Sequence, residues 1–168
     1  MIKYSIVIVD DEKTIRDGIM MAFDGIYRAA AFPNAEEALD FMQSDPPDLV
    51  ILDIGLPGMS GIDALKKIKT EHPEVLVIMI TAYEDIETVI SAMKAGTYDY
   101  VVKPLHMDSL EITIKNALDT IRLRKEVQAL QKKHLKEHIP CFIGESNAIQ
   151  DVMEFIKIVA KSPDTPVL

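Results

Sequence analysis

The sequence predicts an α/β fold: a five-stranded, doubly wound parallel sheet followed by a C-terminal helical extension. Five short apolar runs have the length of buried strands, at residues 4–9, 27–32, 49–52, 75–80 and 98–102. Segments of helical periodicity alternate with them, at 12–23, 34–44, 62–72, 85–95 and from 108 to about 137. Regular alternation of strands and helices is typical of parallel sheets, because each parallel connection needs a crossover.

Capping and breaking residues support the helix boundaries. Asn34 is a favoured N-cap residue and opens the helix predicted at 34–44. Pro73 follows the helix at 62–72, and Gly96 follows the one at 85–95, where glycine commonly ends a helix.

Composition favours a cytoplasmic chain that does not enter a membrane. The 168 residues suffice for one compact domain and an appendage, and 48% hydrophobic with 27% charged residues is ordinary for globular proteins. No apolar run approaches the ~20 residues that a membrane span needs, and the N-terminus enters a strand without a signal-peptide pattern. One cysteine, Cys141, excludes an internal disulfide framework and fits a reducing compartment.

The acidic charge is concentrated in the first part of the chain. Residues 1–106 hold 18 acids against 9 lysines and arginines, whereas residues 107–168 hold 9 of each. A strongly acidic part repels the phosphates of nucleic acids, so we expect it not to bind DNA.

Charged and hydroxyl side chains follow four of the predicted strands. Asp10 and Asp11 end the first strand, with Glu12 next; Asp53, Thr81 and Lys103 end the third, fourth and fifth. In a doubly wound sheet the functional crevice lies at the carboxyl ends of the strands. Two carboxylates ~4 Å apart repel by about 4 kcal/mol at an effective dielectric near 20. A hard cation relieves that repulsion, and Mg²⁺ accepts a few carboxylate oxygens.

Over roughly residues 1–122 the chain resembles the receiver domain of two-component response regulators (CheY-like). The matching residues are Asp10–Asp11, Asp53 in "LDIGLPGMSG", Thr81 in "MITAY" and Lys103 in "YVVKP". The resemblance implies a flavodoxin-like sheet with strand order 2-1-3-4-5. It also implies a phosphoprotein whose Asp53 accepts a phosphoryl group from a sensor histidine kinase, and therefore a signalling domain rather than an enzyme.

The same resemblance implies a role for each residue of the site. Mg²⁺ would be held by Asp11, Asp53 and the backbone carbonyl of Gly55, with Asp10 bound through water. The phosphoryl oxygens would be contacted by the Thr81 hydroxyl, by Lys103 and by the backbone N–H groups of Ile54 and Ala82. Thr81 and Tyr100 would act as a switch, and the Lys103–Pro104 peptide bond would be cis.

The remaining chain indicates a branch of the family. Residues 123–139 predict a helical linker and possible coiled coil, with a dimer seam of Leu123, Val127 and Leu130 at four-then-three spacing. Residues 140–168 resemble the opening of the AAA+ domain of sigma-54-dependent, NtrC-like transcription activators. No GxxxxGK[ST] phosphate loop occurs, so we expect no ATPase activity here. The resemblance implies a homodimer that reaches DNA and sigma-54 RNA polymerase only through domains missing from this chain.

Two other classes of protein remain as alternatives. A haloacid-dehalogenase-like phosphatase also uses an aspartyl nucleophile and Mg²⁺, but it needs a D-x-D-x-[TV] run that "VDDEKT" does not supply. A flavodoxin-like ligand-binding domain needs a hydroxyl- or glycine-rich phosphate loop after the first strand, where this chain has an acidic pair.

Overall fold

The computed structural model describes residues 4–82 and 86–138. The predicted beginning of an AAA+ domain, at 140–168, therefore lies outside the described residues. Five strands, β1 (Ser5–Val9), β2 (Arg28–Phe32), β3 (Leu49–Asp53), β4 (Leu76–Thr81) and β5 (Asp99–Val102), form one sheet. All neighbours are parallel and the order is β2-β1-β3-β4-β5, which confirms the predicted fold.

Five helices connect and follow the strands: α1 (Lys13–Phe23), α2 (Ala35–Ser44), α3 (Gly61–Glu71), α4 (Ile86–Lys94) and α5 (Met107–His138). Asn34 caps α2 as predicted, since its side chain accepts a hydrogen bond from the backbone N–H of Glu37. Gly96 follows α4 in the left-handed region (φ 92°) and closes it, because its N–H donates to the carbonyl of Met93.

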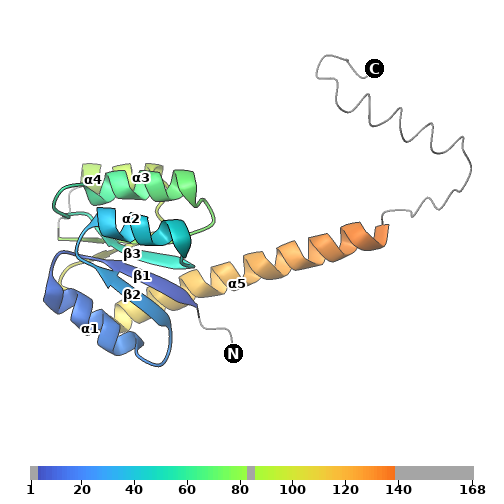
Figure 1. Cartoon of the computed structure of the whole chain (residues 1–168), viewed down its shortest axis with the longest axis horizontal. Coiled ribbons are helices and arrows are strands. Elements are labelled where there is room, and N and C mark those ends of the chain that lie inside the picture. Colours follow the sequence, from blue (N-terminus) through green and yellow to red (C-terminus); the bar gives the residue numbers. More distant parts are fainter. Residues whose placement is uncertain (1–3, 83–85, 139–168) are drawn as a thin grey trace, which may run out of the picture. The chain divides into compact units, whose positions relative to one another are not determined.

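The sheet separates two hydrophobic cores (Figure 1). Successive residues of a strand point to opposite faces. Val7 and Val9 thus pack with α2, α3 and α4, whereas Ile6 and Ile8 pack with α1 and α5. Because both faces are covered, the central strands β1, β3 and β4 are buried along their whole length and do not alternate between apolar and polar residues, whereas the edge strands β2 and β5 are only partly buried.

The last helix, α5, is partly buried in its first half and exposed to solvent beyond it. Buried positions of α5 end at Ile121, and residues 122–133 are all exposed. Near this transition Lys125 Nζ donates to Asp48 Oδ1 at 2.8 Å, while Asp48 Oδ2 accepts the backbone N–H of Ser5 at 2.9 Å. The helix is thus tied to the beginning of the sheet just as its burial ends.

The chain divides into two compact units, Met1–Val127 and Gln128–Leu168. The boundaries predicted at residues 122 and 139 stay predictions. In the part of the chain that the structure describes, no helix is both long and apolar enough to cross a bilayer.

Candidate functional site

The loop after β1 presents a buried acid and an exposed acid. Asp10 is 0% exposed, and its Oδ1 accepts the backbone N–H of Glu12 at 2.8 Å. Asp11 is exposed to solvent. Arg16, one turn into α1, donates from Nη1 to the carbonyls of Asp10 at 2.7 Å and Asp11 at 2.9 Å. These two hydrogen bonds hold the backbone of the loop, and so fix the positions from which the two acidic side chains extend.

Asp53 lies buried at the carboxyl end of β3. Its Oδ1 accepts the N–H of Gly55 at 3.2 Å. The N–H of Ile54 instead donates to the carbonyl of Ile80 at 2.9 Å. This bond closes the pairing of Asp53 with Ile80, and the phosphoryl-binding role expected of the Ile54 N–H stays a prediction. The N–H that faces the Asp53 carboxylate is that of Gly55.

Lys103 joins the acids of two strands. Its Nζ lies 3.0 Å from Asp53 Oδ2, 3.1 Å from Asp10 Oδ2 and 2.8 Å from Glu12 Oε1. Burial alone would lower the pKa of the Lys103 ammonium, but its contacts with the carboxylates of Glu12, Asp53 and Asp10 outweigh burial and raise that pKa. Lys103 is thus a fixed positive charge at neutral pH, and its peptide bond to Pro104 is cis, as expected from the resemblance.

The charge balance at Asp10 remains unfavourable in spite of Lys103. Burial raises the pKa of the Asp10 carboxyl, against the lowering effects of the hydrogen bond that it accepts from the N–H of Glu12 and of its contact with Lys103. Asp10 Oδ2 is buried, and among the described residues no donor meets it with hydrogen-bond geometry; its contact with Lys103 is an ion pair only. A buried carboxylate oxygen without a hydrogen bond is a group that a cation would satisfy.

Three acids of the first loop lie close enough to share a cation. Asp10, Asp11 and Glu12 each offer a carboxylate oxygen, and these oxygens lie within 4.8 Å of one another. Asp53 is connected to this group through Lys103 rather than directly. An all-oxygen donor set with a high negative charge fits Mg²⁺. Sequence reasoning gave Glu12 no role, although its place as the third consecutive acid after β1 was a signal.

The other predicted residues lie on the strands nearest Lys103. Thr81 is buried at the end of β4, and its carbonyl accepts the backbone N–H of Lys103 at 2.8 Å, so these two predicted contacts of a phosphoryl group are neighbours. Ala82 follows Thr81 and is exposed. Tyr100, on β5, pairs with Met79 of β4 and is 39% exposed, and its role as a switch stays a prediction.

A family model for the response regulator receiver domain matches residues 6–115. The chain belongs to this family. The receiver is 39% identical over 153 residues to the nitrogen assimilation regulatory protein NtrX of Azorhizobium caulinodans, with 89% of this chain and 33% of the relative covered. It is 33% identical over 156 residues to the DNA-binding transcriptional regulator NtrC of Escherichia coli, with 92% and 33% covered. The chain thus spans about a third of the length of these relatives.

Solved structures agree with this family. A crystal structure of NtrX from Brucella abortus, in complex with ADP, superposes with a TM-score of 0.71 at 34% identity, covering 95% of this chain and 34% of that one. A CheY-like receiver domain protein from Methanospirillum hungatei gives a TM-score of 0.69 at 30% identity, covering 73% and 99%. The phosphatase and flavodoxin-like binding alternatives are not favoured by these relationships.

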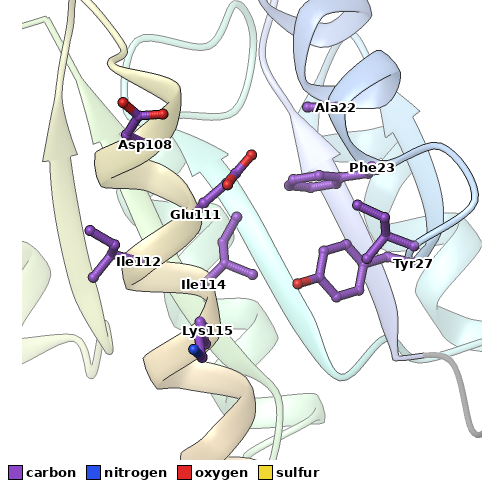
Figure 2. A pocket seen from close by; sticks show the side chains of 9 residues that line it. Ala22, Phe23, Tyr27, Asp108, Glu111, Ile112, Ile114 and Lys115 are labelled. Carbon is purple, nitrogen blue, oxygen red and sulfur yellow. The ribbon is translucent and has the colours of Figure 1, made fainter.

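Two hollows adjoin α1 of the receiver. One has a volume of about 550 Å³ and lies beside the site, with Glu12, Thr14, Lys103 and Leu105 among its lining residues. The other, of about 390 Å³, lies between the end of α1 and the beginning of α5. In Figure 2 the rings of Phe23 and Tyr27 face Glu111 and Ile114 of α5 across it. None of the residues that line the second hollow belongs to the predicted site.

In this receiver the Asp10→Asn substitution is expected to stabilise the metal-free fold near pH 7. A carboxyl whose pKa is raised by folding stabilises the fold below its unfolded pKa of 3.8, and that contribution is lost as pH rises through the folded pKa. The charged form therefore opposes folding at neutral pH, and asparagine removes that charge. Thermal unfolding in EDTA measures the effect, at on the order of 2–4 °C for each kcal/mol gained.

The pH dependence provides the contrast for this prediction. The gain should shrink as pH falls from about 7 toward 4, because Asp10 of the wild-type chain then becomes neutral as well. Asp40→Asn, which neutralises an exposed carboxylate on α2, is the matched control and should change little. A metal-free Asp10→Asn variant less stable than the wild type at neutral pH would contradict the prediction.

Proposed function

We propose that this receiver is a phosphoacceptor module whose Asp53 carboxylate takes up a phosphoryl group from a sensor histidine kinase. The observation that carries the proposal is the position of Asp53: buried at a strand end, 3.0 Å from the ammonium of Lys103 and adjacent to the N–H of Gly55. Fixed donors around a carboxylate favour the addition of a group that brings negative charge.

The chemistry is an in-line phosphoryl transfer. One oxygen of Asp53 forms a bond to phosphorus while the bond between phosphorus and the donor atom breaks. The leaving group, a histidine imidazole of the kinase or acetate from acetyl phosphate, keeps the electron pair of that bond. Lys103 and the N–H of Gly55 stabilise the oxygens that carry the charge, and the Thr81 hydroxyl and the N–H of Ala82 are proposed as further donors.

A magnesium ion fits the acids of this site. Asp10, Asp11, Asp53 and the backbone carbonyl of Gly55 would hold it, and the orphaned Oδ2 of Asp10 supports this assignment. When bound, Mg²⁺ would neutralise negative charge that the carboxylates and the phosphoryl oxygens share. The protein contributes the rest: Arg16 fixes the loop that carries Asp10 and Asp11, and Lys103 keeps its charge because three carboxylates raise its pKa.

The test is the mass of the intact chain after incubation with acetyl phosphate. We expect one phosphoryl group per molecule in the presence of Mg²⁺ and little or none in EDTA. The adduct should be lost in alkali or hydroxylamine, as an acyl phosphate is. An unlabelled chain that releases phosphate continuously from phosphate esters would indicate a phosphatase, and a chain that does neither would contradict the proposal.

Phosphorylation is proposed to be transmitted through Thr81 and Tyr100. Thr81 is buried at the site, whereas Tyr100 is half-exposed two strand positions before the end of the neighbouring strand, where it pairs with Met79. Movement of the Thr81 hydroxyl toward the phosphoryl group leaves space that the ring of Tyr100 enters. A hydrogen bond to a charged group contributes roughly 1.5–3 kcal/mol, which shifts a two-state equilibrium by about ten- to a hundredfold.

Assembly is proposed to run through the exposed stripe of α5. Leu123, Val127 and Leu130 are each at least 51% exposed, in a stretch of helix that the sheet no longer covers. A two-fold pairing of this stripe would bury three apolar side chains from each copy. The relatives NtrX and NtrC are regulators about three times as long as this chain. We propose that pairing of the receiver controls such a sigma-54-dependent activator, whose DNA and polymerase contacts lie in other domains.

Alanine substitution of Leu123, Val127 and Leu130 together is expected to weaken dimerisation at least about a hundredfold, because each fully buried side chain contributes about 1.5–3 kcal/mol. Sedimentation velocity of the phosphorylated and unphosphorylated chain measures this. Ile112→Ala is the matched control, since Ile112 is an exposed apolar residue of the same helix outside the stripe. A wild-type chain that is monomeric in both states would contradict the seam. Thr81→Ala should keep labelling at Asp53 but lose the change in assembly.

A further inference from the structure

Glu12 contacts Lys103, the ammonium that we propose to bind a phosphoryl oxygen. It occupies the N-cap position of α1, yet its side chain accepts no hydrogen bond from the helix. Its Oε1 accepts from Lys103 Nζ at 2.8 Å, the shortest of the three contacts that this ammonium makes with carboxylates. We propose that Glu12 is a positioning residue that latches Lys103 in the unphosphorylated receiver and so slows phosphorylation. The inference rests on the proposed phosphoacceptor function.

The limited number of hydrogen bonds that Lys103 is able to donate explains why its contact with Glu12 affects phosphorylation. Lys103 has three N–H donors, and three carboxylates lie within 3.1 Å of its nitrogen. Its Nζ already donates to two of them and forms an ion pair with the third, so a phosphoryl oxygen that contacts Lys103 competes with these carboxylates for the ammonium. Asp53 is the acceptor itself, and Asp10 is fully buried with its loop held by Arg16. Glu12 is the partner that remains to be displaced.

Burial and space identify Glu12 as the group that moves. Its side chain is 56% exposed, against 0% for Asp10 and 6% for Asp53. It also lines the hollow of about 550 Å³ that opens beside Lys103, so the released carboxylate has solvent and room to enter. Exposed ion pairs are weak, and breaking this one costs far less than exposing a buried carboxylate.

Two substitutions separate the latch from the charge of Glu12. Glu12→Asp keeps the charge but removes one methylene, and aspartate at an N-cap position turns its carboxylate toward the N–H groups of the helix. Glu12→Gln keeps the length but removes the charge. At saturating Mg²⁺ both variants should be labelled by acetyl phosphate about two- to fivefold faster than the wild type, the factor expected for release of an exposed ion pair.

The experiment compares initial labelling rates by intact mass, with Mg²⁺ affinity measured by calorimetry without phosphodonor to set a saturating concentration for each variant. Asp17→Asn is the matched control, because it removes a negative charge from the same helix without touching Lys103, and it should keep the wild-type rate. Thermal unfolding should show that Glu12→Asp is at least as stable as the wild type, which separates a faster rate from a loosened fold.

Each outcome decides the matter. Acceleration in both variants supports the latch. Acceleration in Glu12→Gln alone would mean that general charge repulsion, not the contact with Lys103, limits the rate, and it overturns the latch. Unchanged or slower labelling in both overturns it as well. A wild-type chain that takes up no phosphoryl group overturns the proposed function and this inference with it.

Discussion

The Asp53→Asn variant is expected to take up no phosphoryl group from acetyl phosphate under conditions in which the wild-type chain is fully labelled. A carboxylate oxygen attacks phosphorus because it carries negative charge, whereas an amide is a far weaker nucleophile. Asparagine has nearly the same shape, and its one amide oxygen is able to replace one of the two carboxylate oxygens, which now accept from Lys103 and from the N–H of Gly55. The change therefore removes the nucleophile while the size of the side chain stays the same.

Intact mass over a time course with Mg²⁺ measures this loss. Thermal unfolding of both chains serves as the control for folding, because the variant must still be folded when its labelling is compared with the wild type. Labelling of Asp53→Asn at a rate comparable to the wild type would mean that another side chain is the acceptor. Peptide mapping of the labelled chain would then name it.

The Gly61→Ala variant is expected to lose about 3 kcal/mol or more of folding free energy, through overpacking against backbone. A Cβ atom at Gly61 would lie 2.1 Å from the carbonyl oxygen of Asp53 and 2.7 Å from the Cα of Ile54. These atoms belong to the main chain that carries the phosphoacceptor, so no side-chain rotation relieves the contact. The loop between β3 and α3 must shift, and the labelling rate at Asp53 should fall along with stability.

Urea unfolding provides the measurement, and Gly18→Ala provides the control. Gly18 lies inside α1 with nothing within 4 Å of an added Cβ, so alanine there should stabilise the chain by roughly 0.5–1 kcal/mol through helix propensity. If the two glycine-to-alanine changes alter the folding free energy in opposite directions, the loss at Gly61 comes from its close contact with the backbone and not from replacing glycine by alanine. A Gly61→Ala chain within about 1 kcal/mol of the wild type contradicts the packing described here.

The elements of this fold were predictable because their signals are local. Each strand is an apolar run bounded by turn or charged residues, and Asn34 and Gly96 mark helix ends by their own backbone chemistry. The gathering of Asp10, Asp53 and Lys103 was predictable for a different reason. Parallel strands place their carboxyl ends at one edge, so residues far apart in sequence meet without any knowledge of side-chain packing.

The features that could not be predicted are contacts between different elements, which depend on side-chain rotamers and on strand register. Whether Glu12 turns toward its own helix or toward Lys103 is decided by a side-chain rotamer that spacing does not encode. That the N–H of Ile54 donates to the carbonyl of Ile80 follows from the register of β3 against β4, which the sequence does not encode. The glycine-rich loop predicts a turn. Only the folded backbone shows that Gly61 is the glycine whose Cα lies too close to the Asp53 carbonyl to carry a side chain.

Because α5 is one continuous helix, a small tilt at its beginning displaces residues farther along it by a larger distance. The helix begins at Met107, four residues after Lys103, and reaches Leu123 without interruption. At 1.5 Å per residue that arm is roughly 24 Å long, so a tilt of about 5° at its origin moves Leu123 by about 2 Å. A displacement of that size forfeits most of the dispersion energy of a packed contact. The ion pair between Lys125 and Asp48, at 2.8 Å, opposes such a tilt. In the proposed seam of Leu123, Val127 and Leu130, a tilt of that size would bring the facing apolar side chains of two copies together or separate them.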